Sequence, residues 1–158
     1  MSVYNRRFIT SDHQPDPAHL QTVGPRIPVE ISIPSALVTQ LTAQNLPIPQ
    51  PINGYALVDT GASMLAVDER ILQRLQLRPF STGAVSTGAG TVVQGIYPVS
   101  MSFPGTTVGA ILVARCLGAN LGDQVNPPLN TIALIGRDTL RDCILVYNGP
   151  LGIFTLAH

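Results

Sequence analysis

Apolar and polar residues alternate along several stretches of the chain, and this two-residue period is typical of β-strands with one buried face. The clearest examples are Ile27, Val29, Ile31 and Ile33, and later Tyr97, Val99, Met101 and Phe103. Pro25, Pro28 and Pro34 lack the N–H that a strand donates, so the first of these strands is expected at a sheet edge. Shorter apolar runs at residues 55–58 and 107–114 indicate buried strands.

Helical spacing is clear in only one segment. Apolar residues recur there at intervals of three and four, and Arg78-Pro79 ends the pattern, which predicts a helix over 67–77. One further helical turn is expected around 36–41. Many short strands with one clear helix predict an all-β fold with a closed, barrel-like sheet.

Turn residues separate the expected strands. Asn53-Gly54 predicts a turn that pairs the Ile52 side with the strand at 55–58, and Asn148-Gly149-Pro150 predicts a hairpin between 143–147 and 151–156. The segment 118–130 is rich in Gly, Asn and Pro and is expected to be a long loop.

A chain of 158 residues is long enough for one domain of ordinary size. Residues 1–25 show little periodicity, which predicts a flexible N-terminal arm. Residues 26–158 then form the folded domain.

Charged residues make up only 11% of the chain, well below the roughly 25% of typical soluble domains, which predicts a weakly charged surface. A permanent partner could cover part of that surface, or Thr, Ser, Asn and Gln could occupy it. The formal net charge is zero and no run of Lys or Arg occurs, so nucleic acid is not expected as a partner. No apolar stretch approaches the roughly 18 residues of a membrane span, and residues 1–24 lack the apolar core of a signal peptide. A cytoplasmic protein that does not interact with membranes is therefore expected.

Cysteine and histidine residues give no sign of a metal site. Cys116 and Cys143 form no CxxC pattern and are expected to be buried, reduced thiols, with a disulfide as the alternative if the protein is exported. The three histidines lie near the termini without the spacing of metal ligands. No metal or other cofactor is expected.

The segment with the clearest chemical meaning is Val58-Asp59-Thr60-Gly61-Ala62-Ser63. The preceding apolar run would carry Asp59 to the end of a strand, where Gly61 permits a tight turn. A carboxylate in such a place is costly to bury unless it accepts hydrogen bonds or shares a proton with a second acid. Asp and Gly are also ordinary turn residues, so a purely structural turn is the competing interpretation.

Two further segments follow this motif in order. Ser86-Thr87-Gly88-Ala89-Gly90-Thr91 is a glycine-rich tip between residues that favour β-structure. Residues 131–138 form a second apolar strand that ends in Gly136-Arg137-Asp138 and leads into a short helical segment. With the Asp-Thr-Gly-Ala-Ser motif and the helix after it, this ordered set resembles the retropepsin-like aspartyl proteases over roughly residues 26–156. A single Asp-Thr-Gly excludes a two-lobed, pepsin-like monomer.

The resemblance implies a homodimeric endopeptidase in which each chain supplies one Asp59. The two carboxyls would share one proton, so that one activates water and the other donates to the carbonyl of a peptide or protein substrate. By analogy, Thr60 ties the two active-site loops together across the dimer axis, with Gly61 as its neighbour in the turn. Ala62, Ser63 and the flap tip, Gly88, Ala89, Gly90 and Thr91, would contact substrate.

The second motif matches the family only in part. Gly136 and Arg137 match the retroviral segment, whereas Asp138 stands where retroviral enzymes have asparagine and matches the cellular relatives. The acid that pairs with this arginine in retroviral enzymes is replaced here by Ser63. Arg137 could therefore pair with Asp138, with Asp142 or with an acid of the partner chain, or remain a solvated charge at a helix start. The C-terminal hairpin also resembles the cellular type.

Two other functions compete with the protease. One is a catalytically silent module of the same fold that dimerises or binds peptides, although such a module would not need an intact Asp59-Thr60-Gly61. The other is an unrelated β-barrel ligand carrier in which this triplet occurs by chance.

Overall fold

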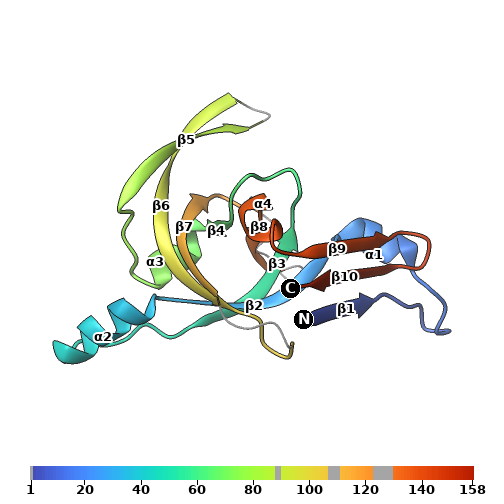
Figure 1. The fold of residues 1–158 in the computed structure, drawn as a ribbon, viewed down its shortest axis with the longest axis horizontal. Coiled ribbons are helices and arrows are strands. Elements are labelled where there is room, and N and C mark those ends of the chain that lie inside the picture. The colour runs from blue at the N-terminus through green and yellow to red at the C-terminus, as the bar shows by residue number, and fades with distance from the viewer. Residues whose placement is uncertain (1, 88–89, 107–110, 123–129) are drawn as a thin grey trace.

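The computed structural model describes residues 2–87, 90–106, 111–122 and 130–158. These residues form a larger sheet of seven strands, in the order β2-β3-β8-β4-β7-β6-β5, and a smaller sheet in the order β1-β10-β9 (Figure 1). The strands of the larger sheet are β2 (Arg26–Ser32), β3 (Ile52–Val58), β4 (Ala66–Asp68), β5 (Ser81–Thr87), β6 (Gly90–Ser102), β7 (Ile111–Ala119) and β8 (Thr131–Ile135). The smaller sheet contains β1 (Val3–Arg7), β9 (Ile144–Asn148) and β10 (Ile153–Ala157), and the helices are α1 (Pro17–Val23), α2 (Ser35–Ala43), α3 (Glu69–Arg74) and α4 (Arg137–Leu140).

The larger sheet closes on itself. Residues 30–32 of β2 pair with β6 as well as with β3, so the first strand of the order meets the sixth. The first part of β2, which contains Pro28, pairs only with β3, as expected for a strand that lacks an N–H donor. The predicted all-β fold with a closed sheet is confirmed, and the described residues contain four short helices where one or two were predicted.

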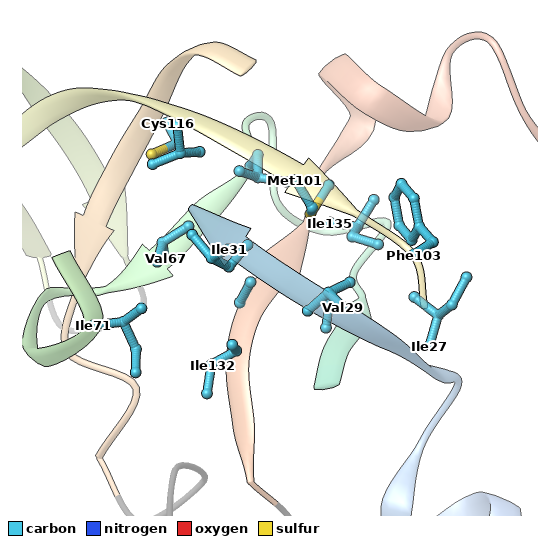
Figure 2. Packing of buried hydrophobic residues seen from close by; sticks show 14 of the residues in the cluster. Ile27, Val29, Ile31, Val67, Ile71, Met101, Phe103, Cys116, Ile132 and Ile135 are labelled. Atoms are coloured by element: carbon cyan, nitrogen blue, oxygen red, sulfur yellow. The ribbon is translucent and has the colours of Figure 1, made fainter. Parts of the chain in front are cut away.

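The main hydrophobic core lies inside this closed sheet (Figure 2). Ile27 and Ile31 of β2 are fully buried, and they pack in one cluster with Val99 and Met101 of β6. These are the alternating positions that predicted the two strands. Burial of each such side chain contributes about 1.5–3 kcal/mol of transfer free energy.

Residues 1–25 differ from the predicted loose arm. Strand β1 pairs along its whole length with β10, and α1 begins after Asp16, whose carboxylate accepts the N–H of His19 at 2.9 Å. Leu20 of α1 is fully buried against Phe8 and Phe154. Only one residue of α1 is buried, so the sequence has no helical periodicity to reveal it.

Two local predictions also differ from the structure. Residues 66–68 are β4, and α3 begins only at Glu69, although the helix was predicted from residue 67. Asn53-Gly54 is not a turn, because β3 runs continuously through it: both residues pair with β2, and β3 also pairs with β8 from Tyr55 onward. Of the strand predicted at 107–114, residues 107–110 lie outside the described residues, and β7 lies inside the sheet between β4 and β6. The predicted C-terminal hairpin is present as β9 and β10.

Candidate active site

The two sequence motifs meet because the strands that lead to them are parallel neighbours. Val58 of β3 lies opposite Ile135 of β8, and the N–H of Asp59 donates to the carbonyl of Ile135 at 3.0 Å. The chain therefore leaves both strands at the same end of the sheet. Asp59 follows one strand and Gly136 follows the other.

Backbone N–H groups hold one oxygen of the Asp59 carboxylate. Oδ1 accepts hydrogen bonds from the N–H of Gly61 at 2.8 Å and of Ala62 at 3.2 Å. Within the described part of the chain, Oδ2 has no hydrogen-bond partner, and the side chain is only partly buried. The turn thus fixes the carboxylate and leaves one oxygen available for other chemistry.

Arg137 stabilises the Asp59 turn by hydrogen bonds to its backbone. This role was not predicted from the sequence. Its Nη1 donates to the carbonyl of Thr60 at 2.7 Å and to that of Gly61 at 2.9 Å. Its backbone N–H donates to the carbonyl of Ala62 at 3.0 Å. The guanidinium thus forms hydrogen bonds with backbone carbonyls of the turn instead of an ion pair with an acid.

Asp138 holds the residues that follow the motif. Its Oδ2 accepts the N–H of Leu65 at 3.0 Å, and its own N–H donates to the carbonyl of Ser63 at 3.2 Å. Oδ1 accepts the N–H of Thr139 at 2.8 Å, which stabilises the start of α4. The two motifs are therefore joined by side chain and backbone over their whole length.

Gly136 allows the two segments to approach so closely. A Cβ at this position would lie 2.4 Å from the carbonyl carbon and oxygen of Met64. Because no side chain fits that gap, glycine is required by the contact between the two segments rather than by the backbone angles, which are extended.

A cleft of about 920 Å³ adjoins Asp59. Three buried residues, Ala66, Ile96 and Leu117, form its apolar floor, and four partly buried side chains pack around them. These four are Met64, Val85, Ala119 and Leu134. Asp59 is the only acidic residue lining the cleft among the described residues.

The hairpin of β5 and β6 forms part of the wall of this cleft. Residues 83–86 of β5 and Gln94 of β6 are among its lining residues. Of the predicted flap tip, Gly88 and Ala89 lie outside the described residues. Gly90, which has a positive φ of 122°, pairs with Thr87, and Thr91 pairs with Ser86; neither Gly90 nor Thr91 lines the cleft. Ala62 and Ser63, also predicted to contact substrate, do line it.

Other lining residues were not identified from the sequence. Arg115 precedes Leu117 and Ala119 on β7, and strand alternation would have placed these three on one face. Asn120 and Leu121 follow directly after that strand. No motif marks them in the sequence.

The described residues contain neither a candidate metal site nor a helix suited to span a membrane. No group of three or more His, Cys, Asp and Glu side chains there could hold a metal ion. No helix among them has the length and apolar character needed to cross a membrane.

Comparison with known proteins finds similarity at the level of solved structures. No protein-family model matches this chain, and no curated protein matches it. The protease of simian foamy virus (mac) is similar with a TM-score of 0.41 and 18% identity, covering 72% of this chain and 91% of that one. A retropepsin-like aspartic protease from Rickettsia conorii is similar with a TM-score of 0.47 and 14% identity, covering 99% of this chain and 92% of that one.

Proposed function

We propose that this chain is an aspartic endopeptidase that acts as a homodimer. Water would be activated between two Asp59 carboxylates, one from each chain, and would attack the carbonyl carbon of a peptide bond. Thr60 and Gly61 would support the site, and the residues of the cleft would bind the peptide.

The main support for the proposal is the local structure around Asp59. Its carboxylate is fixed through one oxygen by two N–H groups, in a turn braced by Arg137, beside a cleft with an apolar floor. A structural turn would not need a cleft at this place. A ligand carrier with a chance Asp-Thr-Gly would not need the second motif to brace the turn.

Proton sharing explains why a second copy is needed. Peptide hydrolysis without a metal requires a base to take a proton from water and an acid to donate to the carbonyl oxygen. Two carboxyls a few Å apart cannot both ionise, so one stays protonated and the pair supplies both groups. Since Asp59 is the only acid lining the cleft among the described residues, the second carboxyl is assigned to a second copy of the chain.

Substrate would bind as an extended strand. The apolar floor favours apolar side chains near the scissile bond, and backbone hydrogen bonding of the β type would hold the peptide under the hairpin of β5 and β6. The tip of that hairpin, at residues 88–91, is proposed to act as a flap that closes over the peptide. A cytoplasmic location remains a prediction from the sequence.

A peptide-library cleavage assay tests the proposal. Wild type should cut peptides between apolar residues, and Asp59→Asn should lose almost all of this activity because the shared proton and the base are both lost. Asp12→Asn is the matched control, since it removes the same charge from an exposed loop residue. Equal cleavage by wild type and Asp59→Asn would remove Asp59 from the mechanism, and a dimeric but inert wild type would favour the silent binding module.

A further inference from the structure

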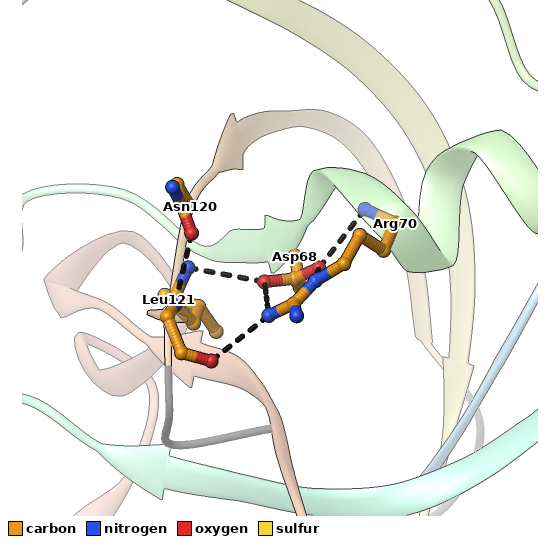
Figure 3. Close-up of polar contacts among 5 residues, drawn as sticks. Asp68, Arg70, Asn120 and Leu121 are labelled. Carbon is orange, nitrogen blue, oxygen red and sulfur yellow. Dashed lines mark hydrogen bonds and ion pairs between the residues drawn. The ribbon is translucent and has the colours of Figure 1, made fainter. Parts of the chain in front are cut away.

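Asp68 is a buried acid outside the catalytic turn, with its side chain only 1% exposed (Figure 3). It ends β4 and precedes α3. Its Oδ1 accepts the backbone N–H and the Nε of Arg70, both at 2.9 Å, and its Oδ2 accepts Nη2 of Arg70 at 3.1 Å. Asp68 and Arg70 therefore form a bidentate ion pair at the start of α3.

This ion pair also holds a turn that belongs to the cleft. Asp68 Oδ2 accepts the N–H of Leu121 at 3.0 Å, and Arg70 Nη2 donates to the carbonyl of Gly122 at 2.9 Å. Strands β4 and β7 are parallel neighbours, and Asp68 lies opposite Ala119. The turn at 120–122 therefore begins next to the Asp68–Arg70 ion pair. Figure 3 shows these contacts between the ion pair and the turn.

In this turn, the side-chain NH₂ of Asn120 is a hydrogen-bond donor that is available to a ligand. Its Oδ1 accepts the N–H of Gly122 at 2.9 Å, which fixes the orientation of the amide without using its NH₂ group. Within the described residues, that NH₂ has no hydrogen-bond partner, and Asn120 is exposed along the same cleft as Asp59. An amide with a fixed carbonyl and an unused NH₂ on a cleft wall is suited to bind a carbonyl oxygen.

We propose that Asn120 is a substrate-binding residue whose side-chain NH₂ donates to a backbone carbonyl of an extended peptide, and that the Asp68–Arg70 pair positions it. The choice of a peptide as the ligand rests on the proposed function. The assignment of Asn120 as a positioned donor rests on the hydrogen bonds of Asn120, Asp68 and Arg70. An extended peptide presents a carbonyl to each side at every second residue. Over an apolar floor, such a carbonyl loses water and needs a donor from the wall.

The ion pair makes the Asn120 NH₂ a better donor because it keeps the side chain ordered. Arg115 and Gln94, which also line the cleft, are longer side chains without a hydrogen bond that fixes them within the described residues. Asn120 is held by its own turn, and the turn is held by Asp68 and Arg70. A donor that is already ordered loses less conformational entropy on binding.

The test measures peptide binding separately from cleavage. A display library of short peptides, about eight residues each, is panned on the Asp59→Asn protein, and the most enriched peptide is synthesised with fluorescein for anisotropy titration. Asn120→Asp, which keeps an acceptor for the Gly122 N–H but replaces the donor, should weaken binding about three- to tenfold. Asn120→Ala should weaken it similarly without adding charge. In the cleaving protein, both changes should raise KM more than they lower kcat.

Arg70 variants test the positioning role. Arg70→Gln should weaken binding by a similar factor, and the double variant with Asn120→Ala should be no weaker than Asn120→Ala alone, because both changes remove the same hydrogen bond. Arg70→Lys, which keeps the charge, should recover part of the affinity. Arg74→Gln is the matched control, as Arg74 is an exposed arginine of the same helix that does not contact the turn.

The outcomes separate the two proposals. Weaker binding by the Asn120 variants without any cleavage by wild type would support the donor and reject the protease. Cleavage with unchanged affinity in both Asn120 variants would reject the donor and leave the protease standing. Additive effects of Arg70→Gln and Asn120→Ala would reject the positioning role, and a library from which no peptide is enriched would overturn the inference.

Discussion

At the scale of single residues, Gly136 is the most tightly constrained position of the candidate site. A Cβ there would overlap the backbone of Met64, which cannot move without shifting the Asp59 turn. Gly136→Ala should therefore destabilise the protein by about 1–3 kcal/mol or more, measured by urea unfolding. Gly149→Ala, where the nearest atom lies 3.6 Å away, should stay within about 0.5 kcal/mol. Equal stability of the two variants would contradict the close approach.

Asp68 links the stability of the fold to pH. Burial raises the pKa of its carboxyl, but hydrogen bonds from Arg70 and from the N–H of Leu121 outweigh this, so the pKa lies below the ordinary value of 3.8. A lowered pKa in the folded state means that the group stabilises the fold above 3.8 and loses this contribution as the pH falls through the lowered value.

The corresponding variant is Asp68→Asn. It should lower the free energy of unfolding at neutral pH by about 1–3 kcal/mol, because donors from the helix start and the turn lose their charged acceptor. It should also weaken the loss of stability below pH 3.8, measured by unfolding at several pH values. An identical acid profile in wild type and variant would show that Asp68 does not carry this dependence.

Cys116 should be chemically inert in the native protein. The thiol is fully buried, and burial raises its pKa to about 12, so almost no thiolate exists near neutral pH. Iodoacetamide at about pH 8 should label Cys143, which is only partly buried, well before Cys116, as read by mass spectrometry. After denaturation both should react, whereas equal labelling rates in the native state would contradict the buried position.

Among the elements, the N-terminal segment distinguishes the packed structure from the loose arm that the sequence predicted. Leu20 of α1 is fully buried with Phe8 and Phe154. Leu20→Ala should cost about 2–5 kcal/mol of stability, and Leu46→Ala, at a residue that is 49% exposed, should cost far less. If residues 1–25 were a loose arm, both substitutions would leave the unfolding curve unchanged.

Long elements with one buried face could be predicted from the sequence, and elements stabilised by distant contacts could not. The alternation in β2 and β6 is visible because every second residue enters the core. Strand β1 is not visible, because its partner β10 lies at the other end of the chain. Asn53-Gly54 has a strong local preference for a turn, but pairing of both residues with β2 overrides it.

The candidate site was predictable to a similar degree. The motif around Asp59 and the segment around Gly136 could be found because each has a characteristic residue order at the end of an apolar strand. The role of Arg137 could not, since its acceptors are backbone carbonyls that any residue would provide. Asn120 and its support by Asp68 and Arg70 depend on the register of β4 against β7, which no local pattern encodes.

For the whole molecule, the proposed catalytic mechanism depends on assembly of two chains. One chain offers one acid to the cleft among its described residues, and the proposed chemistry needs two. The low fraction of charged residues agrees with a surface that a second copy could cover. Activity should therefore depend on which copies meet, and not only on whether each copy is folded.

Mixing wild type with Asp59→Asn measures this dependence most directly. At a fixed amount of wild type and after subunit exchange, excess variant should draw wild-type chains into mixed dimers that hold one Asp59. Activity per wild-type chain should then fall to about half in an equal mixture and to about a tenth with a ninefold excess, following random pairing. An equal excess of an unrelated protein should have no effect. Activity that stays constant as Asp59→Asn is added, with exchange verified by mass, would show that one chain suffices and would contradict the shared site.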